Sequence, residues 1–302
     1  VERNTSEYIW SHGRDRLDLL HRLSTNNLID MSDHEVKSTV LTNPVGRIVD
    51  YLTVLNLANK SLIITSPGKS AVVLQWVMKY VFFQDDVTFQ IPDEPLSRIG
   101  LYGTKANMIV NKLAPECSTL SYNQVFTRDD CAWILRVPPP GGLGYEIISD
   151  PTTTKTIIEI ATTAGAVNAH SSLYDLLRIE AGLPGAGYEI TDSYIPLEIG
   201  LRDAISFTKG CYTGQEIIAR MDSRGKLAKT LVGLRSSDEL PIGAILKAPD
   251  GSSGTVTSSV YSPKLGYIGL GLVKPSACTP GTNLSVSING FSGTASVSKL
   301  PF

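Results

Sequence analysis

A change in sequence texture near Gly225 is the feature that most constrains the fold of this 302-residue chain. Beyond that point helical periodicity disappears, and short segments rich in Val, Ile, Ser and Thr alternate with Gly, Pro and Asn turns. Such segments at close spacing are typical of a compact all-β unit, either a small barrel or a sandwich. We therefore expect one domain over residues 1–225 and an all-β domain over residues 226–302. Its strands are expected at 230–234, 244–247, 254–260, 267–273, 283–288 and 293–297.

Before that change, helical and extended patterns alternate along the chain. Apolar residues at helical spacing predict helices over 13–27, 68–81, 104–113 and 151–164. Extended segments are predicted at 37–42, 46–57, 61–66, 86–91, 98–103, 131–137 and 145–149. This mixture predicts an α+β region whose sheets are antiparallel or mixed.

The composition favours a globular protein and excludes several other classes. Charged residues make up 19% of the chain, hydrophobic residues 42%, and the formal net charge is -2, so we expect neither disorder nor a broadly basic surface for nucleic acid. The four cysteines form no CxxC pair, which argues against a zinc knuckle or a self-contained iron–sulfur site and favours a reducing compartment. We expect no secretory signal, no membrane span and no bound metal.

The run Lys209-Gly210-Cys211-Tyr212-Thr213-Gly214-Gln215-Glu216 places one thiol directly before a predicted helix. Thr213 and Glu216 have the spacing of a capping box, so Cys211 is expected just outside the positive end of that helix. Free amides and the helix dipole, with Lys209 nearby, stabilise a thiolate there and predict a reactive thiol or a soft ligand. The alternative is a small hydrophobic residue buried in a loop.

Asp50 lies in an extended segment, on the same predicted strand face as Ile48, Leu52 and Val54. A carboxylate among apolar side chains is costly unless it meets a donor, a cation or a ligand. Two interpretations follow. Asp50 makes a polar contact in a ligand pocket, or it pairs with a backbone amide or a basic side chain at the edge of a sheet.

A second candidate acid continues the apolar stripe of a predicted helix. Leu173, Leu176 and Leu177 form this stripe, and Glu180 takes its next position, where a core leucine is expected. Gly182 marks the end of the helix. Glu180 therefore either contacts a ligand through charge-assisted hydrogen bonds or turns toward solvent or a nearby base.

Residues 203–216 resemble the signature of the YgfZ family, folate-binding relatives of the glycine-cleavage T-protein (aminomethyltransferase), and the match is unbroken from Lys209 to Glu216. The resemblance covers most of the chain. It extends through 175–184, 196–201, Pro138-Pro139 and 144–146. It implies a T-protein-like folate-binding region of two intertwined α+β subdomains, followed by a C-terminal small β-barrel.

The resemblance also implies roles for three residues. Asp50 matches the T-protein aspartate that orients folate for aminomethyl transfer, and Glu180 matches the glutamate that contacts the pterin, so both would bind tetrahydrofolate or a derivative. Cys211 would act as a redox-active thiol or a transient ligand. Arg47 and Tyr51 differ from the glycine and the second acid that are usual at these positions in T-proteins.

The function implied first is that of an accessory factor for the assembly or repair of iron–sulfur proteins, with an A-type iron–sulfur carrier or recipient iron–sulfur proteins as partners. The alternatives are a tetrahydrofolate-dependent one-carbon (aminomethyl-type) transferase and a factor affecting tRNA modification. The charge balance disfavours direct binding of nucleic acid. The expected compartment is the cytoplasm for a bacterial chain and the mitochondrial matrix for a eukaryotic chain with a removed presequence.

Overall fold

The computed structural model describes residues 1–2, 6–128, 131–136 and 144–302. Within these limits the chain forms two compact units, each discontinuous in sequence. The first comprises 1–42, 49–171 and 203–213, and the second comprises 43–48, 172–202 and 214–302. Pro138-Pro139, which contributed to the resemblance, lies outside the described residues.

The first unit contains a five-stranded sheet in the order β2-β3-β4-β1-β5. Its strands are β1 (Glu7–His12), β2 (Val36–Thr42), β3 (Ile48–Asn56), β4 (Lys60–Thr65) and β5 (Thr88–Gln90). Strand β1 pairs antiparallel with both β4 and β5. Because side chains alternate along a strand, Ile9 packs beneath the helices α1 (Arg16–Leu23) and α2 (Ser70–Met78), while Tyr8 faces the other way.

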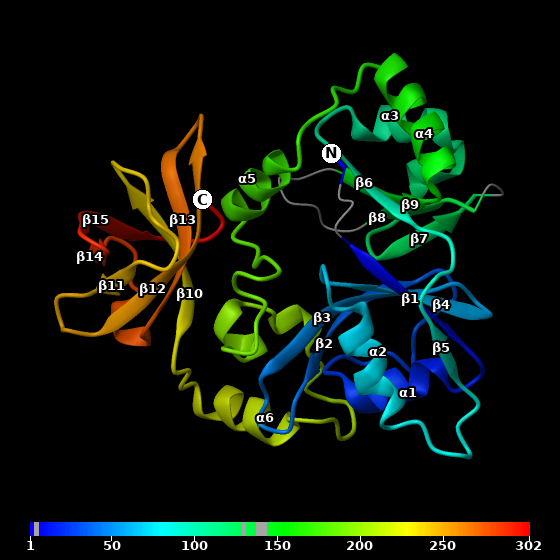
Figure 1. The fold of residues 1–302 in the computed structure, drawn as a ribbon, viewed down its shortest axis with the longest axis horizontal. Coiled ribbons are helices and arrows are strands. Elements are labelled where there is room, and N and C mark those ends of the chain that lie inside the picture. The colour runs from blue at the N-terminus through cyan, green and yellow to red at the C-terminus, as the bar shows by residue number, and fades with distance from the viewer. Residues whose placement is uncertain (3–5, 129–130, 137–143) are drawn as a thin grey trace. The chain divides into compact units, whose positions relative to one another are not determined.

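A second sheet of the same unit has the order β6-β9-β8-β7. Its strands are β6 (Ser97–Tyr102), β7 (Gln124–Thr127), β8 (Trp133–Arg136) and β9 (Gly144–Ser149), and its helices are α3 (Ala106–Leu113) and α4 (Pro151–Thr163). Ile134 packs with these helices, whereas Trp133 and Leu135 pack against Tyr8 and Leu62 of the first sheet. The unit is therefore layered as helices, sheet, sheet and helices (Figure 1).

The second unit is built around a closed six-stranded barrel in the order β10-β13-β12-β11-β14-β15. Its strands are β10 (Thr230–Ser236), β11 (Ile245–Lys247), β12 (Ser253–Ser262), β13 (Gly266–Val273), β14 (Asn283–Ile288) and β15 (Phe291–Ser298). Pairing of β15 with β10 closes the barrel. The barrel confirms the predicted fold class and excludes the sandwich.

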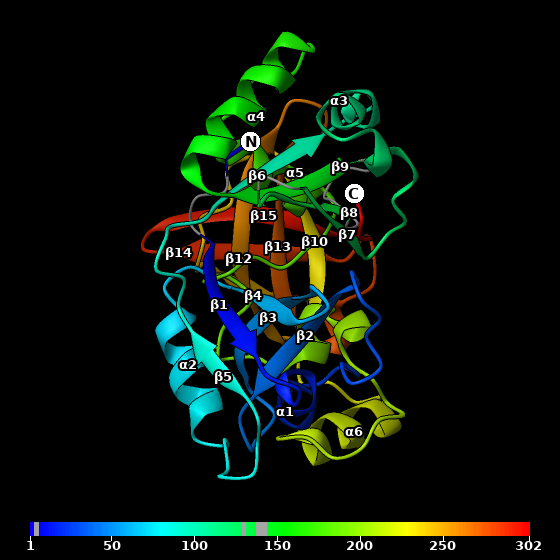
Figure 2. The same ribbon diagram turned by 90° about the vertical axis from the view of Figure 1, so that its right-hand side faces the viewer.

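Two helices precede the barrel in this unit, α5 (Ser172–Glu180) and α6 (Gln215–Arg224). Ile179 of α5 packs on Ile268 and Leu270, which lie on the outer face of the barrel wall. Figure 2 shows the barrel strands β10, β12 and β13 in the view turned by 90°. The predicted end of the helix at Gly182 is confirmed: this glycine follows α5 in the left-handed conformation, and its amide donates to the carbonyl oxygen of Ile179. No helix in the described ranges is long and apolar enough to cross a membrane.

Candidate functional site

Asp50 lies near the start of β3, on the face that Leu52 and Val54 share beneath the helices. Its side chain is buried, with 1% exposed, which confirms the predicted strand face. The backbone amide of Ser66 donates to Oδ2 at 3.0 Å. The second oxygen, Oδ1, is buried and has no hydrogen-bond partner in the described part of the chain. Half of the carboxyl group is therefore satisfied by the fold, and half is left as a free acceptor.

Burial raises the pKa of Asp50 above its ordinary value because a charged carboxylate loses hydration there. Interactions with Ser66 and with the backbone of Tyr51, and the positive charge of Lys69, lower the pKa and so act in the opposite direction. A ligand that donates to Oδ1 would favour the charged form further and would lower this pKa. The hydrogen bond from Ser66 confirms pairing with a backbone amide, whereas contact of the other oxygen with a ligand stays a prediction.

The loop that supplies the Ser66 amide leads into α2 with the sequence Pro67-Gly68-Lys69-Ser70. This run resembles the end of a phosphate loop, but Ile63 replaces the required earlier glycine. In the structure the amide of Ser70 donates to Oε2 of Glu7 at 2.8 Å, and hydrogen bonds from Ser70 lower the pKa of Glu7. A carboxylate of the chain itself thus occupies the start of α2, which argues against a nucleotide site.

Arg47, which replaces the usual T-protein glycine, has a structural role in the second unit. Its guanidinium donates to the carbonyl oxygen of Ser193 and lies 3.7 Å from Oε2 of Glu198. The same Glu198 oxygen accepts from the amide of Ile195 at 3.0 Å. The arginine therefore compensates a buried acid.

Cys211 is exposed, so the alternative of a buried hydrophobic residue is wrong. The predicted capping box is also wrong, because α6 begins at Gln215 with Gly214 as its N-cap and no side chain caps it. Gly214 has φ +83, and a Cβ there would lie 2.6 Å from the carbonyl oxygen of Asn43, so tight backbone packing requires glycine. Glu216 instead forms an exposed ion pair with Arg220.

The ammonium group of Lys209 lies at the C-terminal end of α1. This group donates to the carbonyl oxygens of His21, Ser24 and Asn26, the latter two at 2.7 and 3.0 Å. Burial lowers the pKa of Lys209 to about 8, while three carbonyl acceptors at the negative end of a helix favour the ammonium form. Together with the Thr42 hydroxyl, which donates to the Thr213 carbonyl oxygen at 2.6 Å, this contact fixes the cysteine segment within the first unit.

Lys209→Met should destabilise the protein by about 2–3 kcal/mol because it removes charged hydrogen bonds from three partly buried carbonyl groups. Urea unfolding measures this loss. Lys112→Met, at an exposed position of the same unit, is the control and should change stability by less than about 0.5 kcal/mol. Equal stability of the two variants would show that Lys209 does not anchor the segment.

The cysteines should differ strongly in reactivity in the native protein. Cys117 is buried, and burial raises the pKa of its thiol to about 11, so almost no thiolate is present near neutral pH. A chromogenic disulfide reagent should label Cys211 within minutes and Cys117 only after unfolding, as read by mass spectrometry. Labelling of Cys117 before Cys211 would contradict the observed burial.

Glu180 ends α5 and is half-buried. Its Oε1 accepts from the hydroxyl of Ser262 at 2.7 Å, and its backbone carbonyl accepts from Phe302. The predicted helix face is wrong, because Leu173 is 37% exposed whereas Arg178 and Ile179 are buried. The barrel wall packs against the face that carries Ile179, so the leucine stripe is not the core side of this helix.

Arg178 and Glu189 form a buried network that the sequence analysis missed. Glu189 is fully buried, accepts from the amide of Gly185 at 2.8 Å and from the hydroxyl of Ser258 at 2.7 Å, and lies 3.6 Å from Arg178. Arg178 also donates to Ser258 and Asp175. Arg178 lies on the polar side of the predicted leucine stripe, so the sequence of this helix does not predict its burial. Contact with Ser258 of the barrel, which is distant in sequence, explains it.

The candidate residues are distributed over both units. Asp50 and Cys211 belong to the first unit and Glu180 to the second. No hydrogen bond or ion pair between described residues joins Asp50 to Cys211. Within the described ranges, no group of three or more His, Cys, Asp and Glu side chains could hold a metal ion.

The two units define a class of protein. It combines a layered α+β region, with a buried aspartate on its first sheet, and a closed barrel in the C-terminal part of the chain. Residues 2–209 match the model of the GCVT N-terminal domain, and residues 229–302 match that of the glycine cleavage T-protein C-terminal barrel domain. The chain therefore belongs to the glycine cleavage T-protein family.

Individual relatives agree with this assignment. The chain is 28% identical to the chloroplastic Arabidopsis thaliana protein At1g60990, over 96% of this chain and 68% of that protein, whose name proposes a transferase activity without a substrate. It is 28% identical to an aminomethyltransferase of Caldanaerobacter subterraneus subsp. tengcongensis, over 91% of this chain and 77% of the enzyme. The crystal structure of glycine cleavage system aminomethyltransferase T from Bartonella henselae superposes with a TM-score of 0.89 at 21% identity, covering 99% and 84% of the two chains. This last likeness establishes the fold.

Proposed function

We propose that this chain is a tetrahydrofolate-dependent transferase of one-carbon units, of the aminomethyl type. The observation that carries the proposal is the buried Oδ1 atom of Asp50, an acceptor that the described residues leave without a donor. Membership of the T-protein family and similarity to proteins named aminomethyltransferases support it. An acceptor without a donor in a desolvated setting is costly, and a donor from a ligand would offset this cost.

The residues present suit a reduced folate. Tetrahydrofolate, when bound, supplies nitrogen atoms that carry the one-carbon unit. Asp50 would accept a hydrogen bond from the ligand at Oδ1 while Ser66 holds Oδ2 in place. In the second unit the Ser262 hydroxyl donates to Glu180, and the pterin contact that the resemblance implies for Glu180 stays a prediction.

A turnover assay tests the proposal. Purified protein should transfer a one-carbon unit between tetrahydrofolate and an amine or thiol acceptor over many cycles, and Cys211→Ser should retain this activity because no hydrogen bond between described residues joins the thiol to Asp50. Absence of transfer by wild-type protein that binds tetrahydrofolate would contradict a transferase and leave a binding function.

Exposure of the Cys211 thiol favours a second candidate, a folate-dependent accessory factor for assembly or repair of iron–sulfur proteins. The surrounding run resembles that of the YgfZ family, and Arg47 and Tyr51 depart from the transferase pattern. Lys209 anchors the segment by its hydrogen bonds, and the exposed thiol would be presented to an A-type iron–sulfur carrier or a recipient protein. One cysteine cannot supply the usual four thiolates, so any cluster would need ligands from that partner.

Cells whose only copy carries Cys211→Ser distinguish the two candidates. The accessory function predicts reduced aconitase and lipoate-dependent activities under oxidative stress, with tetrahydrofolate binding unchanged. The transferase predicts that aconitase and lipoate-dependent activities both stay normal in the same cells. Cys131→Ser, at another exposed thiol, is the matched control.

A further inference from the structure

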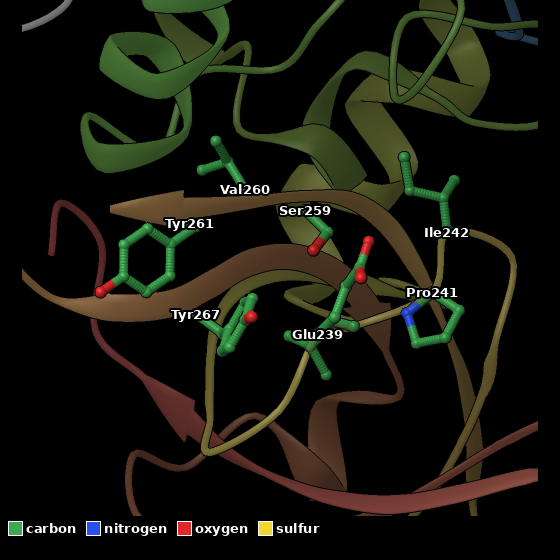
Figure 3. A pocket seen from close by; sticks show the side chains of 8 residues that line it. Glu239, Pro241, Ile242, Ser259, Val260, Tyr261 and Tyr267 are labelled. Atoms are coloured by element: carbon green, nitrogen blue, oxygen red, sulfur yellow. The ribbon is translucent and has the colours of Figure 1, made fainter. Parts of the chain in front are cut away.

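A hollow of about 460 Å³ lies on the barrel, far in sequence from Asp50 (Figure 3). It is bounded by the ends of β12 and β13 and by the segment that joins β10 to β11. Its lining residues are Glu239, Leu240, Pro241, Ile242, Ser259, Val260, Tyr261 and Tyr267.

The strand register explains why space is left at this place. Ser259 pairs with Gly269, and Tyr261 pairs with Tyr267. A glycine therefore lies opposite Ser259, where a larger side chain would fill the hollow. A Cβ on Gly269 would lie 2.5 Å from the carbonyl oxygen of Ser258 and 3.3 Å from Leu240, so no other residue fits. The absence of a side chain here is therefore required by the barrel itself.

The alternation of side chains places the hollow at the mouth of the barrel interior. Ile268 points outward, where it packs on Ile179, so its neighbours Tyr267 and Gly269 face inward. Gly271, two positions further along the same face, lies against Leu234 of the barrel core. The mouth of a β-barrel is a preferred place for small-ligand sites.

The lining combines aromatic rings, apolar walls and a single carboxylate. The rings of Tyr261 and Tyr267 are 5.1 Å apart and meet edge to face, and Tyr261 is 59% exposed. Glu239 is the one formally charged residue of the lining and makes no hydrogen bond or ion pair with a described residue. Figure 3 shows its carboxylate and the Ser259 hydroxyl pointing into the same space.

We propose that this hollow binds an alkylammonium group, carried either by a free amine or by a lysine side chain of a partner protein. Tyrosine rings attract a cation over their faces, the carboxylate of Glu239 supplies the opposite charge, and Leu240 and Pro241 suit an aliphatic stem. An anion such as the glutamate tail of folate is repelled here. The site is therefore chemically distinct from the one at Asp50.

Ligand-detected NMR and calorimetry on the full chain test this site with Nα-acetyl-lysine amide and n-butylammonium. Nα-acetyl-norleucine amide is the uncharged counterpart of the first probe. Wild-type protein should bind at least one of the two cationic probes, and it should bind the norleucine probe at least about fivefold more weakly than that cationic probe. Binding of n-butylammonium indicates a free amine as a sufficient source, and binding of the lysine probe alone indicates a partner protein. Equal binding of the lysine and norleucine probes would overturn the proposal, and so would binding of neither cation.

Two variants locate the site. Glu239→Gln should weaken cation binding about fivefold or more, whereas Asp238→Asn removes the same charge one residue away, outside the lining, and should change it less than about twofold. Ser259→Phe should fill the hollow and abolish binding. If the two charge changes weaken cation binding equally, the cation is attracted by the overall negative charge of this surface, which would contradict a specific site at Glu239.

Discussion

Asp50→Asn is expected to weaken tetrahydrofolate binding by about 10- to 100-fold, because a hydrogen bond to a charged acceptor becomes one to a neutral amide. The same change should stabilise the free protein by about 1 kcal/mol, or about 2 °C in its unfolding midpoint, because a buried carboxylate with a free oxygen is replaced by an uncharged group. Isothermal titration and calorimetric unfolding measure the two effects. If Asp50 served the fold alone, Asp50→Asn would lower the stability of the protein instead.

The stability gain should depend on pH in a definite direction. The pKa of Asp50 is raised in the folded state, so the folded protein holds a proton that the unfolded chain releases. Stability of the wild type relative to Asp50→Asn should therefore fall as pH rises from the ordinary value of 3.8 to the folded pKa, and stay constant above it. Asp33→Asn, at an exposed position, should show neither the binding loss nor this pH dependence.

Glu189→Ala is expected to cause the largest loss of stability, about 3–5 kcal/mol, because it leaves Arg178 without its buried acid and removes the acceptor for Gly185 and Ser258. The unfolding midpoint should fall by about 6–20 °C if the loss is shared by the whole chain. Circular dichroism and urea unfolding measure it.

Glu216→Ala is the matched control, since Glu216 also pairs with an arginine but is exposed. It should cost about 0.5 kcal/mol or less. The double variant Arg178→Met with Glu189→Ala should lose less than the sum of the single losses, because no uncompensated charge remains. Additive losses would show that the two residues stabilise the fold independently.

Local patterns were sufficient to predict most of the fold. The spacing of turns and β-branched residues predicted the barrel strands, and the alternation along β3 placed Asp50 on the correct face. Strand β1 was not predicted, because its apolar residues Tyr8, Ile9 and Trp10 are consecutive and do not alternate with polar ones. Both faces of this strand are covered, by helices on one side and by the second sheet on the other, and that burial is a tertiary property.

The site was predicted less completely, and the errors share a cause. The capping box and the leucine stripe of α5 were inferred from spacing within one segment. In the structure, close backbone packing decides the start of α6, and contact with the barrel decides the buried face of α5. The hydrogen bonds from Lys209 to the end of α1 likewise join residues that are distant in sequence. Spacing indicates which residues could act, whereas long-range contacts decide which of them are free to do so.

Carbon-13 NMR of the Asp50 side-chain carboxyl, assigned by its absence in Asp50→Asn, tests the account most directly. Without ligand the pKa of this group should lie above the ordinary value of 3.8. Saturating tetrahydrofolate should lower it, since a donor to Oδ1 stabilises the carboxylate. An unshifted pKa in the free protein, or a raised one that tetrahydrofolate leaves unchanged, would contradict the claim that the free oxygen of Asp50 binds folate.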